Sequence, residues 1–140
     1  MNEPKIKLLL QLADHLENGK LGHQRFHFGF YNGGPTDDRY ADTPELKNCG
    51  TSGCAIGECP FIFPGWFFNV HFEPRYEKYA STVLSATGFF DLDWLQYLHL
   101  FINNSHRIEA YGGKLLNAQA SRIEVAGNIR TFCRIMEVKM

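Results

Sequence analysis

The sequence predicts an α+β fold that is mainly α, with four or five helices and a small two-stranded β element. Apolar residues recur at helical spacing near both ends of the chain and through residues 76–101. Two short stretches between the first helix and residue 76 alternate apolar and polar residues, which is typical of half-buried strands. The chain has 140 residues, which is the size of one domain. We therefore expect a single globular domain, residues 1–140.

The composition is that of an ordinary globular protein, with 44% hydrophobic and 21% charged residues. The formal net charge is −1, so no global field favours nucleic acid or an anionic membrane as a partner. No uninterrupted apolar run reaches the roughly 18 residues that a membrane span needs. The first apolar run is also too short for a signal peptide. We therefore expect a cytoplasmic protein whose cysteines are thiols.

Residues 4–18 predict the first helix, because apolar residues fall on one face and charged residues on the other. Pro4 suits the first turn of a helix, and Gly19 suits its C-terminal stop. His15 lies on this helix. We interpret it as a partly exposed polar residue, since isolated histidines are rarely ligands.

Residues 25–31 and 68–72 predict the two strands. Phenylalanines alternate with other residues in the first stretch, and Phe68, Val70 and Phe72 alternate with polar residues in the second. The simplest hypothesis pairs the two stretches in one small sheet. This pairing places His27 and His71 on its more polar face.

The second half of the chain predicts helices over residues 76–86, 91–101 and 117–138. Gly88 is expected to end the first of them. Asp91 is expected to cap the second, because an aspartate side chain accepts hydrogen bonds from the first turn of a helix. The third has Ile123, Ala126, Ile129, Phe132, Cys133 and Met136 on one face.

The stretch from Cys49 to Gly57 combines two of the four cysteines with glycines and a possible helix start. The hydroxyl of Thr51 can accept from a backbone N–H of the first turn, so we expect it to cap a helix. Gly50 gives the chain the freedom for a sharp entry. Cys54 then begins an apolar run.

The motif Cys-Gly-Thr-x-x-Cys-x-x-Gly in this stretch resembles the signature of a family of small uncharacterised phage and bacterial proteins. Its members open with a Leu-x-x-Leu-Ala-x-x-Leu-Glu-x-Gly helix, similar to residues 9–19, and close with an Arg-Ile-Glu helix, similar to residues 122–124. An aromatic stretch similar to residues 26–30 precedes the cysteines. In the family the helix continues after the motif, whereas Pro60 and Pro64 follow here. The resemblance implies a fold and a phage or bacterial source, but no activity. The motif residues are Cys49, Gly50, Thr51, Cys54 and Gly57.

Residues 58–68 are rich in large apolar side chains and contain two prolines, Pro60 and Pro64. Prolines at this spacing argue against a regular helix or a central strand, so we expect an irregular segment. Such a segment is either buried or open as a contact surface. We expect Trp66 to be exposed, because Pro64 and Gly65 form a turn before it. The candidate binding surface consists of Phe61, Phe63, Trp66 and Phe67.

Three cysteines, Cys49, Cys54 and Cys59, are separated by four residues each. This spacing lies within the range of structural zinc sites, and His71 or His27 is a conceivable fourth ligand. Structural zinc sites, however, usually use two separated pairs of ligands. We therefore expect no cofactor and no bound metal, and keep zinc as an alternative.

Cys54 near a helix N-terminus is also a candidate nucleophile, because the helix dipole lowers a thiol pKa. His71 or His27 is then its general base. The local sequence has a superficial likeness to a papain-type nucleophile turn, but the chain is too short for the spacing of that fold. We therefore assign no catalytic residue and keep this triplet as an alternative.

These observations favour a non-enzymatic phage or bacterial accessory protein that acts by binding another macromolecule. Inhibition of a host or defence protein is one form of that action. The expected partner is a protein or a second copy of the chain, with no nucleic acid and no membrane. The alternatives are a small thiol-dependent hydrolase and a structural zinc-binding module.

Overall fold

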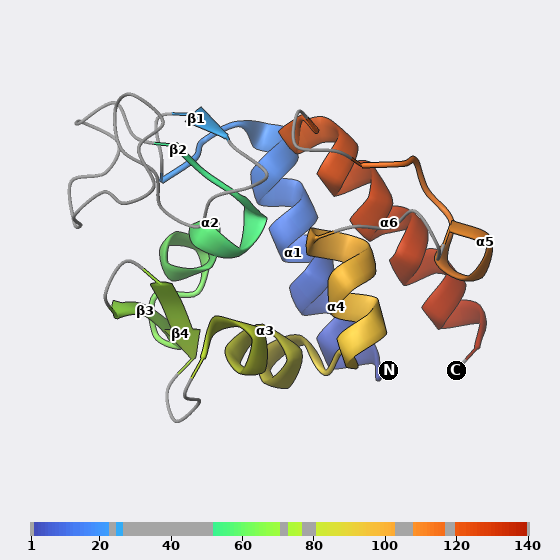
Figure 1. Ribbon diagram of the computed structural model, residues 1–140, viewed down its shortest axis with the longest axis horizontal. Helices are drawn as coiled ribbons and strands as arrows, with labels where there is room; N and C mark the ends of the chain where they lie inside the picture. The colour runs from blue at the N-terminus through green and yellow to red at the C-terminus, as the bar shows by residue number, and fades with distance from the viewer. Residues whose placement is uncertain are drawn as a thin grey trace.

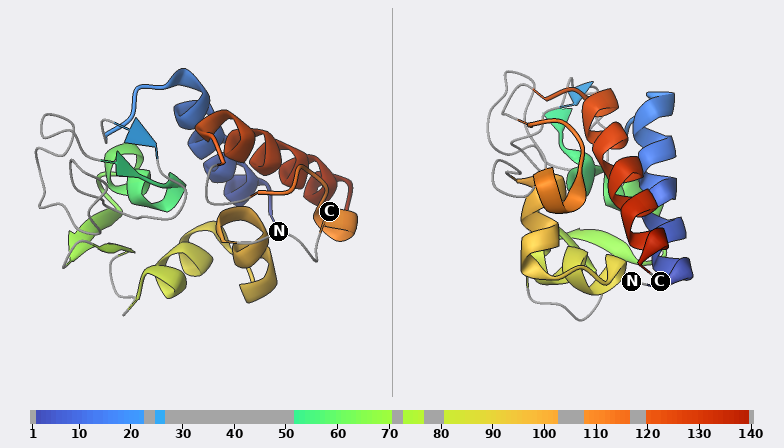
Figure 2. Two further views of the ribbon diagram at one scale, coloured as in Figure 1. Left: turned by 45° about the horizontal axis from the view of Figure 1, so that its top comes forward. Right: turned by 90° about the vertical axis from the view of Figure 1, so that its right-hand side faces the viewer.

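Two long helices, α1 (Glu3–Asn18) and α6 (Arg122–Val138), lie side by side along one edge of the molecule (Figure 1). This computed structural model describes residues 2–22, 25–26, 52–70, 73–76, 81–102, 108–116 and 120–139. The remaining elements are β1 (Arg25–Phe26), β2 (Ser52–Gly53), α2 (Ala55–Ile62), β3 (Phe67–Val70), β4 (Glu73–Tyr76), α3 (Thr82–Phe90), α4 (Trp94–Phe101) and α5 (Ile108–Tyr111). Helices α2 and α3 pack against α1, whereas α4 and α5 pack against α6 (Figure 2).

The described part of the chain is mainly α, as predicted, but the α+β class with one small two-stranded element is wrong, and the described residues form six helices instead of four or five. Within the described residues, the predicted pairing of 25–31 with 68–72 is not formed. Instead, β1 pairs with β2 in parallel, and β3 pairs with β4 in antiparallel register. Strands β3 and β4 are separated by only two residues, so their pairing closes a much shorter loop. The strands are two to four residues long and do not build a sheet that organises the fold.

Helix α1 confirms the prediction for residues 4–18 almost to the residue. Asn2 is its N-cap and accepts a 3.1 Å hydrogen bond from the backbone N–H of Lys5. Pro4 lies in the first turn, and Gly19 ends the helix in the left-handed conformation with φ 72°. Its buried face is formed by Ile6, Leu9, Leu12, Ala13 and Leu16.

Helix α6 begins at Arg122, whereas the sequence predicted a start at Asn117, which lies outside the described residues. Ser121 is the N-cap and forms a capping box with Glu124, which fixes the start. Ile123, predicted on the buried face, is 51% exposed. At about 100° per residue, Ile123 lies nearly opposite the centre of the buried face, which turns it toward solvent. The buried face consists of Val125, Ala126, Asn128, Ile129, Phe132 and Cys133.

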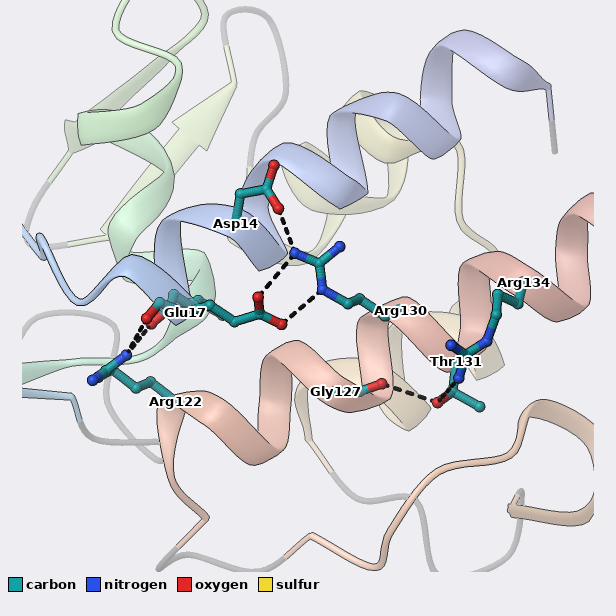
Figure 3. A network of polar contacts seen from close by, with 8 residues as sticks. Asp14, Glu17, Arg122, Gly127, Arg130, Thr131 and Arg134 are labelled. Carbon is teal, nitrogen blue, oxygen red and sulfur yellow. Dashed lines mark hydrogen bonds and ion pairs between the residues drawn. The ribbon is translucent and has the colours of Figure 1, made fainter.

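Two arginines of α6 bind the C-terminal end of α1 (Figure 3). Arg122 Nη1 donates to the backbone oxygens of Leu16 and Glu17 at 2.6 and 2.8 Å. These carbonyls belong to the last turn of α1, which has no helical donors for them. Arg130 forms ion pairs with the carboxylates of Glu17 and Asp14. The antiparallel packing of the two helices is therefore held by polar contacts at its edge as well as by the apolar core.

The prediction that Asp91 caps a helix start is wrong. Asp91 ends α3 in the left-handed conformation with φ 56°, and Asp93 caps α4 instead. Asp93 accepts a 2.8 Å hydrogen bond from the backbone N–H of Gln96, whose side chain completes a capping box. Helix α3 begins at Thr82 after the N-cap Ser81, and Tyr76, its predicted first residue, belongs to β4.

Aromatic rings fill the space between α2, the β3–β4 hairpin and α3. Phe63 and Phe67 each contact both Phe89 and Phe90, with ring centroids 4.8–6.5 Å apart. Tyr76 adds its ring at 5.1 Å from Phe89. Such tilted and edge-to-face contacts stabilise a core beyond simple area burial.

Candidate functional site

The cysteine motif leads into α2, and Cys54 rather than Thr51 caps that helix. Cys54 Sγ accepts from the backbone N–H of Gly57 at 3.5 Å. Thr51 lies outside the described residues, as do Cys49 and Gly50. Ser52 is part of β2, so the helix begins later than a Thr51 cap requires.

The expectation of an irregular segment after Gly57 is also wrong, because α2 continues through Pro60 to Ile62. The backbone hydrogen bonds of the helix before and after the proline are kept. Glu58 N–H donates to Cys54 O at 3.1 Å, and Phe63 N–H donates to Cys59 O at 2.8 Å. Pro60 itself removes only one backbone donor, and a helix this short and buried tolerates that loss.

The two described thiols of this segment, Cys54 and Cys59, are buried and poorly suited to nucleophilic chemistry. Burial raises the pKa of Cys54 to about 11, despite the hydrogen bond from Gly57. Burial also raises the pKa of Cys59 well above its ordinary value, and Cys59 donates its S–H to Ala55 O at 3.7 Å. At pH 7 about one Cys54 in ten thousand is a thiolate, which is the reactive form. The proposed bases His27 and His71 lie outside the described residues.

Within the described ranges, no group of three or more His, Cys, Asp or Glu side chains is placed to hold a metal. Cys54 caps α2 and Cys59 lies within it, while the other proposed ligands, Cys49, His27 and His71, lie outside those ranges. The two described thiols already take part in hydrogen bonds within the helix. The geometry therefore offers no support for the zinc alternative.

Directly after the motif, the buried Glu58 of α2 contacts the partly buried His15 of α1, a polar pair that sequence reasoning missed. His15 Nε2 lies 2.7 Å from Oε1 of Glu58, and the carboxylate side chain of Glu58 has no solvent exposure. The same oxygen accepts a 2.6 Å hydrogen bond from the backbone N–H of Gly22. An ionised carboxylate only accepts hydrogen bonds, so His15 Nε2 carries the proton of the pair whenever Glu58 is ionised. Glu58 thus joins α2 both to α1, through His15, and to the segment that follows α1, through Gly22.

The four residues of the predicted aromatic surface divide into two groups. Trp66 is 54% exposed, as predicted, and its ring lies 6.2 Å from that of Tyr76. Phe61 is partly exposed and lies over Gly22, where a Cβ would meet its ring. Phe63 and Phe67 are buried in the aromatic core, so their assignment to a binding surface is wrong. Helix α2 and the turn after it point these two side chains inward.

A second apolar surface lies on α4. Trp94, Leu95 and Ile102 are 55%, 53% and 47% exposed, and Leu98 between them is half-buried. Residues 94, 98 and 102 are spaced by four and therefore lie along one side of the helix, with Leu95 next to Trp94. We call these four residues the α4 stripe. The opposite faces of α4 bury Tyr97, His99, Leu100 and Phe101.

The sequence of α4 contains apolar residues on nearly all sides of the helix, and this pattern could have indicated the α4 stripe. A helix of that kind either lies fully inside a core or leaves one apolar face uncovered. The sequence alone does not distinguish these two cases. In the structure α4 lies beside α3 (Figure 2). Trp94, Leu95 and Ile102 of its stripe remain exposed.

No family model, curated protein or solved structure matches this chain. Among the described residues, no helix combines the length and the apolar character that crossing a membrane requires.

Proposed function

We propose that this chain is a non-enzymatic protein that acts by binding another macromolecule, namely a protein. The resemblance of its cysteine motif suggests a phage or bacterial accessory protein, and inhibition of a host or defence protein is the action we propose. The complex then forms in the cytoplasm of a bacterial or phage-infected cell. The single observation that carries the proposal is the α4 stripe.

The α4 stripe suits helix-in-groove docking. Its side chains follow the spacing by which an amphipathic helix places anchors in an apolar groove. Leaving Trp94, Leu95 and Ile102 in water forgoes about 25 cal/mol for each Å² of apolar surface. A partner that covers the stripe recovers this free energy. Tryptophan is also among the residues that contribute most to interface energies.

Charges near the stripe indicate the chemistry of the partner. Asp91 and Asp93 are both exposed and lie at the N-terminal end of α4. A partner groove that is apolar along its floor and basic at one end complements this arrangement. Charge of this kind guides association and orientation more than it adds affinity.

The proposal is tested by affinity capture from bacterial lysate with the wild-type chain and with Leu95→Lys, followed by calorimetry with the purified captured protein. A Lys at position 95, beside Trp94, places a charge in the contact. We expect the affinity to fall at least tenfold, which corresponds to about 1.4 kcal/mol. If every captured protein binds Leu95→Lys as tightly as wild type, the α4 stripe is not the docking surface.

Leu115→Lys is the matched control, because Leu115 is also exposed but lies in the segment between α5 and α6. It makes the same chemical change away from the α4 stripe. A partner whose binding is lost in both variants responds to net charge rather than to the stripe, and that result contradicts the proposal.

A further inference from the structure

The chain contains two Asn-Gly pairs, and one of them, Asn18-Gly19, lies where α1 ends. Asn18 is the last residue of the helix, and Gly19 is its C-cap with φ 72°. Both residues are exposed to solvent. The backbone carbonyl of Asn18 belongs to the last turn, whose carbonyls have no helical donors. The pair is therefore accessible to water and lies at the part of α1 that opens most easily.

An Asn-Gly pair can modify itself, with water as the only co-reactant, and asparagine is accordingly a thermolabile residue. The backbone nitrogen of the glycine attacks Cγ of the asparagine side chain. The new C–N bond closes a five-membered succinimide ring, and the side-chain amide leaves as ammonia with the N–H proton. Water then opens the ring at either carbonyl and leaves aspartate or isoaspartate. Glycine favours the first step, because no side chain hinders the approach of its nitrogen.

The closed end of α1 opposes this reaction. In an α-helix ψ is about −42°, and the five-membered ring requires a very different ψ at the asparagine. Asn18 must therefore leave the helical conformation before Gly19 N can reach its Cγ. This step unwinds the last turn of α1, so the rate of the reaction depends on how easily that turn opens.

Arg122 of α6 holds the last turn of α1 closed (Figure 3). Its Nη1 donates to Leu16 O at 2.6 Å and to Glu17 O at 2.8 Å, the two carbonyls before Asn18. The guanidinium group also lies against Gly19, where a Cβ would be 3.1 Å from Cζ of Arg122. Hydrogen bonds from a charged donor are roughly twice as strong as neutral ones. Docking of α6 therefore makes opening of this turn less favourable.

We propose that Asn18 is a site of spontaneous deamidation and that Arg122 controls its rate by keeping the last turn of α1 closed. The site reacts slowly while α6 is docked on α1 and faster when the turn opens. Because ammonia is lost to solvent, the change is a one-way covalent switch. It is separate from the α4 stripe.

Both products disturb the end of α1. Each places a new carboxylate at the C-terminal end of the helix, where the negative end of the helix dipole repels it. Isoaspartate also adds one carbon to the main chain before Gly19. Gly22, three residues later, donates its N–H to Oε1 of Glu58 at 2.6 Å, so a displacement of this segment reaches the buried carboxylate of α2. Conversion of Asn18 therefore weakens the contact of α2 with α1.

The test is peptide mapping by mass spectrometry after incubation of the folded protein at pH 8. Trypsin places the two Asn-Gly pairs in separate peptides, residues 8–20 and 26–39. We expect Asn18 to convert about tenfold faster in Arg122→Ala than in wild type, because hydrogen bonds from a charged donor no longer oppose opening. Wild type unfolded in urea should convert fastest. Arg122→Lys, which keeps the positive charge and the start of α6, is measured alongside and should also convert faster than wild type.

Arg134→Ala is the matched control, because Arg134 is an exposed arginine of the same helix that contacts Thr131 rather than α1. It should convert Asn18 at the wild-type rate. The second pair, Asn32-Gly33, lies outside the described residues and is the internal reference for global unfolding. The proposal is overturned if both Arg122 variants convert Asn18 at the wild-type rate, or accelerate Asn32 by the same factor as Asn18. It is also overturned if folded wild type converts Asn18 as fast as the urea-unfolded chain, or if Asn18 stays unmodified in urea.

Discussion

Glu58 of α2 lies against His15 of α1, with 2.7 Å between Oε1 and Nε2 and no solvent exposure of the carboxylate side chain. The two residues are 43 positions apart, and their contact fixes how the cysteine-motif helix sits on the first helix. A buried carboxylate without hydrogen-bond donors is unfavourable by several kcal/mol. The few donors to Glu58 therefore contribute strongly to the stability of the fold.

The first prediction concerns this pair. His15→Ala removes one donor from a buried carboxylate and should lower the free energy of unfolding by about 1–3 kcal/mol, measured by urea denaturation at pH 7. Glu137→Gln, an exposed change on α6, is the control and should stay within about 0.5 kcal/mol of wild type. Equal denaturation midpoints for the two variants would show that water replaces His15 without loss.

The second prediction concerns the thiol of Cys54, whose pKa burial raises to about 11. In the unfolded chain the thiol ionises near pH 9, so between pH 9 and 11 only the unfolded state loses this proton. The contribution of the thiol to stability is therefore complete below pH 9 and falls as pH rises to 11, by at most about 3 kcal/mol.

Urea denaturation of wild type and Cys54→Ala at pH 8 and pH 10.5 measures this contribution. Other titrating groups are the same in both proteins, so their effect cancels in the difference. We expect the stability advantage of wild type to shrink at the higher pH. Iodoacetamide should also leave Cys54 unmodified at pH 7.5 in the folded protein and modify it in urea, as peptide mass spectrometry will show. Rapid labelling in the folded state would restore the nucleophile hypothesis.

The third prediction separates two aspartates that the sequence did not assign correctly. Asp93→Ala removes the N-cap of α4 and should cost about 1 kcal/mol. Asp91→Gly should instead stabilise the protein by up to about 1 kcal/mol, because Asp91 adopts a left-handed conformation that glycine prefers. Thermal denaturation of both variants measures the difference, and a loss at both positions would mean that Asp91 makes a contact beyond its backbone role.

These residues also show how far the sequence determines the structure. Helix α1 was predicted closely because its periodicity, Pro4 and Gly19 are local signals. Asp91 and Asp93 are two residues apart with the same side chain, and only the backbone conformation between α3 and α4 decides which one is the cap. The continuation of α2 past Pro60 depends on its burial against α1, which a propensity argument does not include.

The candidate sites were less predictable than the helices. The contact of Glu58 with His15 depends on the packing of two distant segments, and a glutamate inside an apolar run was its only local sign. The sequence identified Trp66 as exposed but placed Phe63 and Phe67 with it, because it missed that α2 continues to Ile62. The α4 stripe depends on which face the rest of the chain covers, and that is a property of the whole fold.

The fourth prediction concerns Gly127. Gly127→Ala should raise the free energy of unfolding by about 0.5–1 kcal/mol at low micromolar concentration, since the new methyl meets no atom within 4 Å. Gly113→Ala is the contrasting variant, because its φ is 90° and its Cβ would collide with Asn128. Gly113→Ala should destabilise the protein. Thermal denaturation of both variants and wild type measures the two effects. A loss of stability in Gly127→Ala would contradict the open space around this position.

The last prediction concerns Trp66, which is exposed and contacts Tyr76 on one side. Trp66→Ala removes little buried area, so its melting temperature should stay within a few degrees of wild type. Phe67→Ala, one residue further, should cost about 3–5 kcal/mol because Phe67 is buried among the aromatic rings of the core. In a Trp94→Phe background Trp66 emits alone, and its fluorescence should be red-shifted and readily quenched by acrylamide. A blue-shifted, unquenched emission would place Trp66 in the core and contradict its exposure.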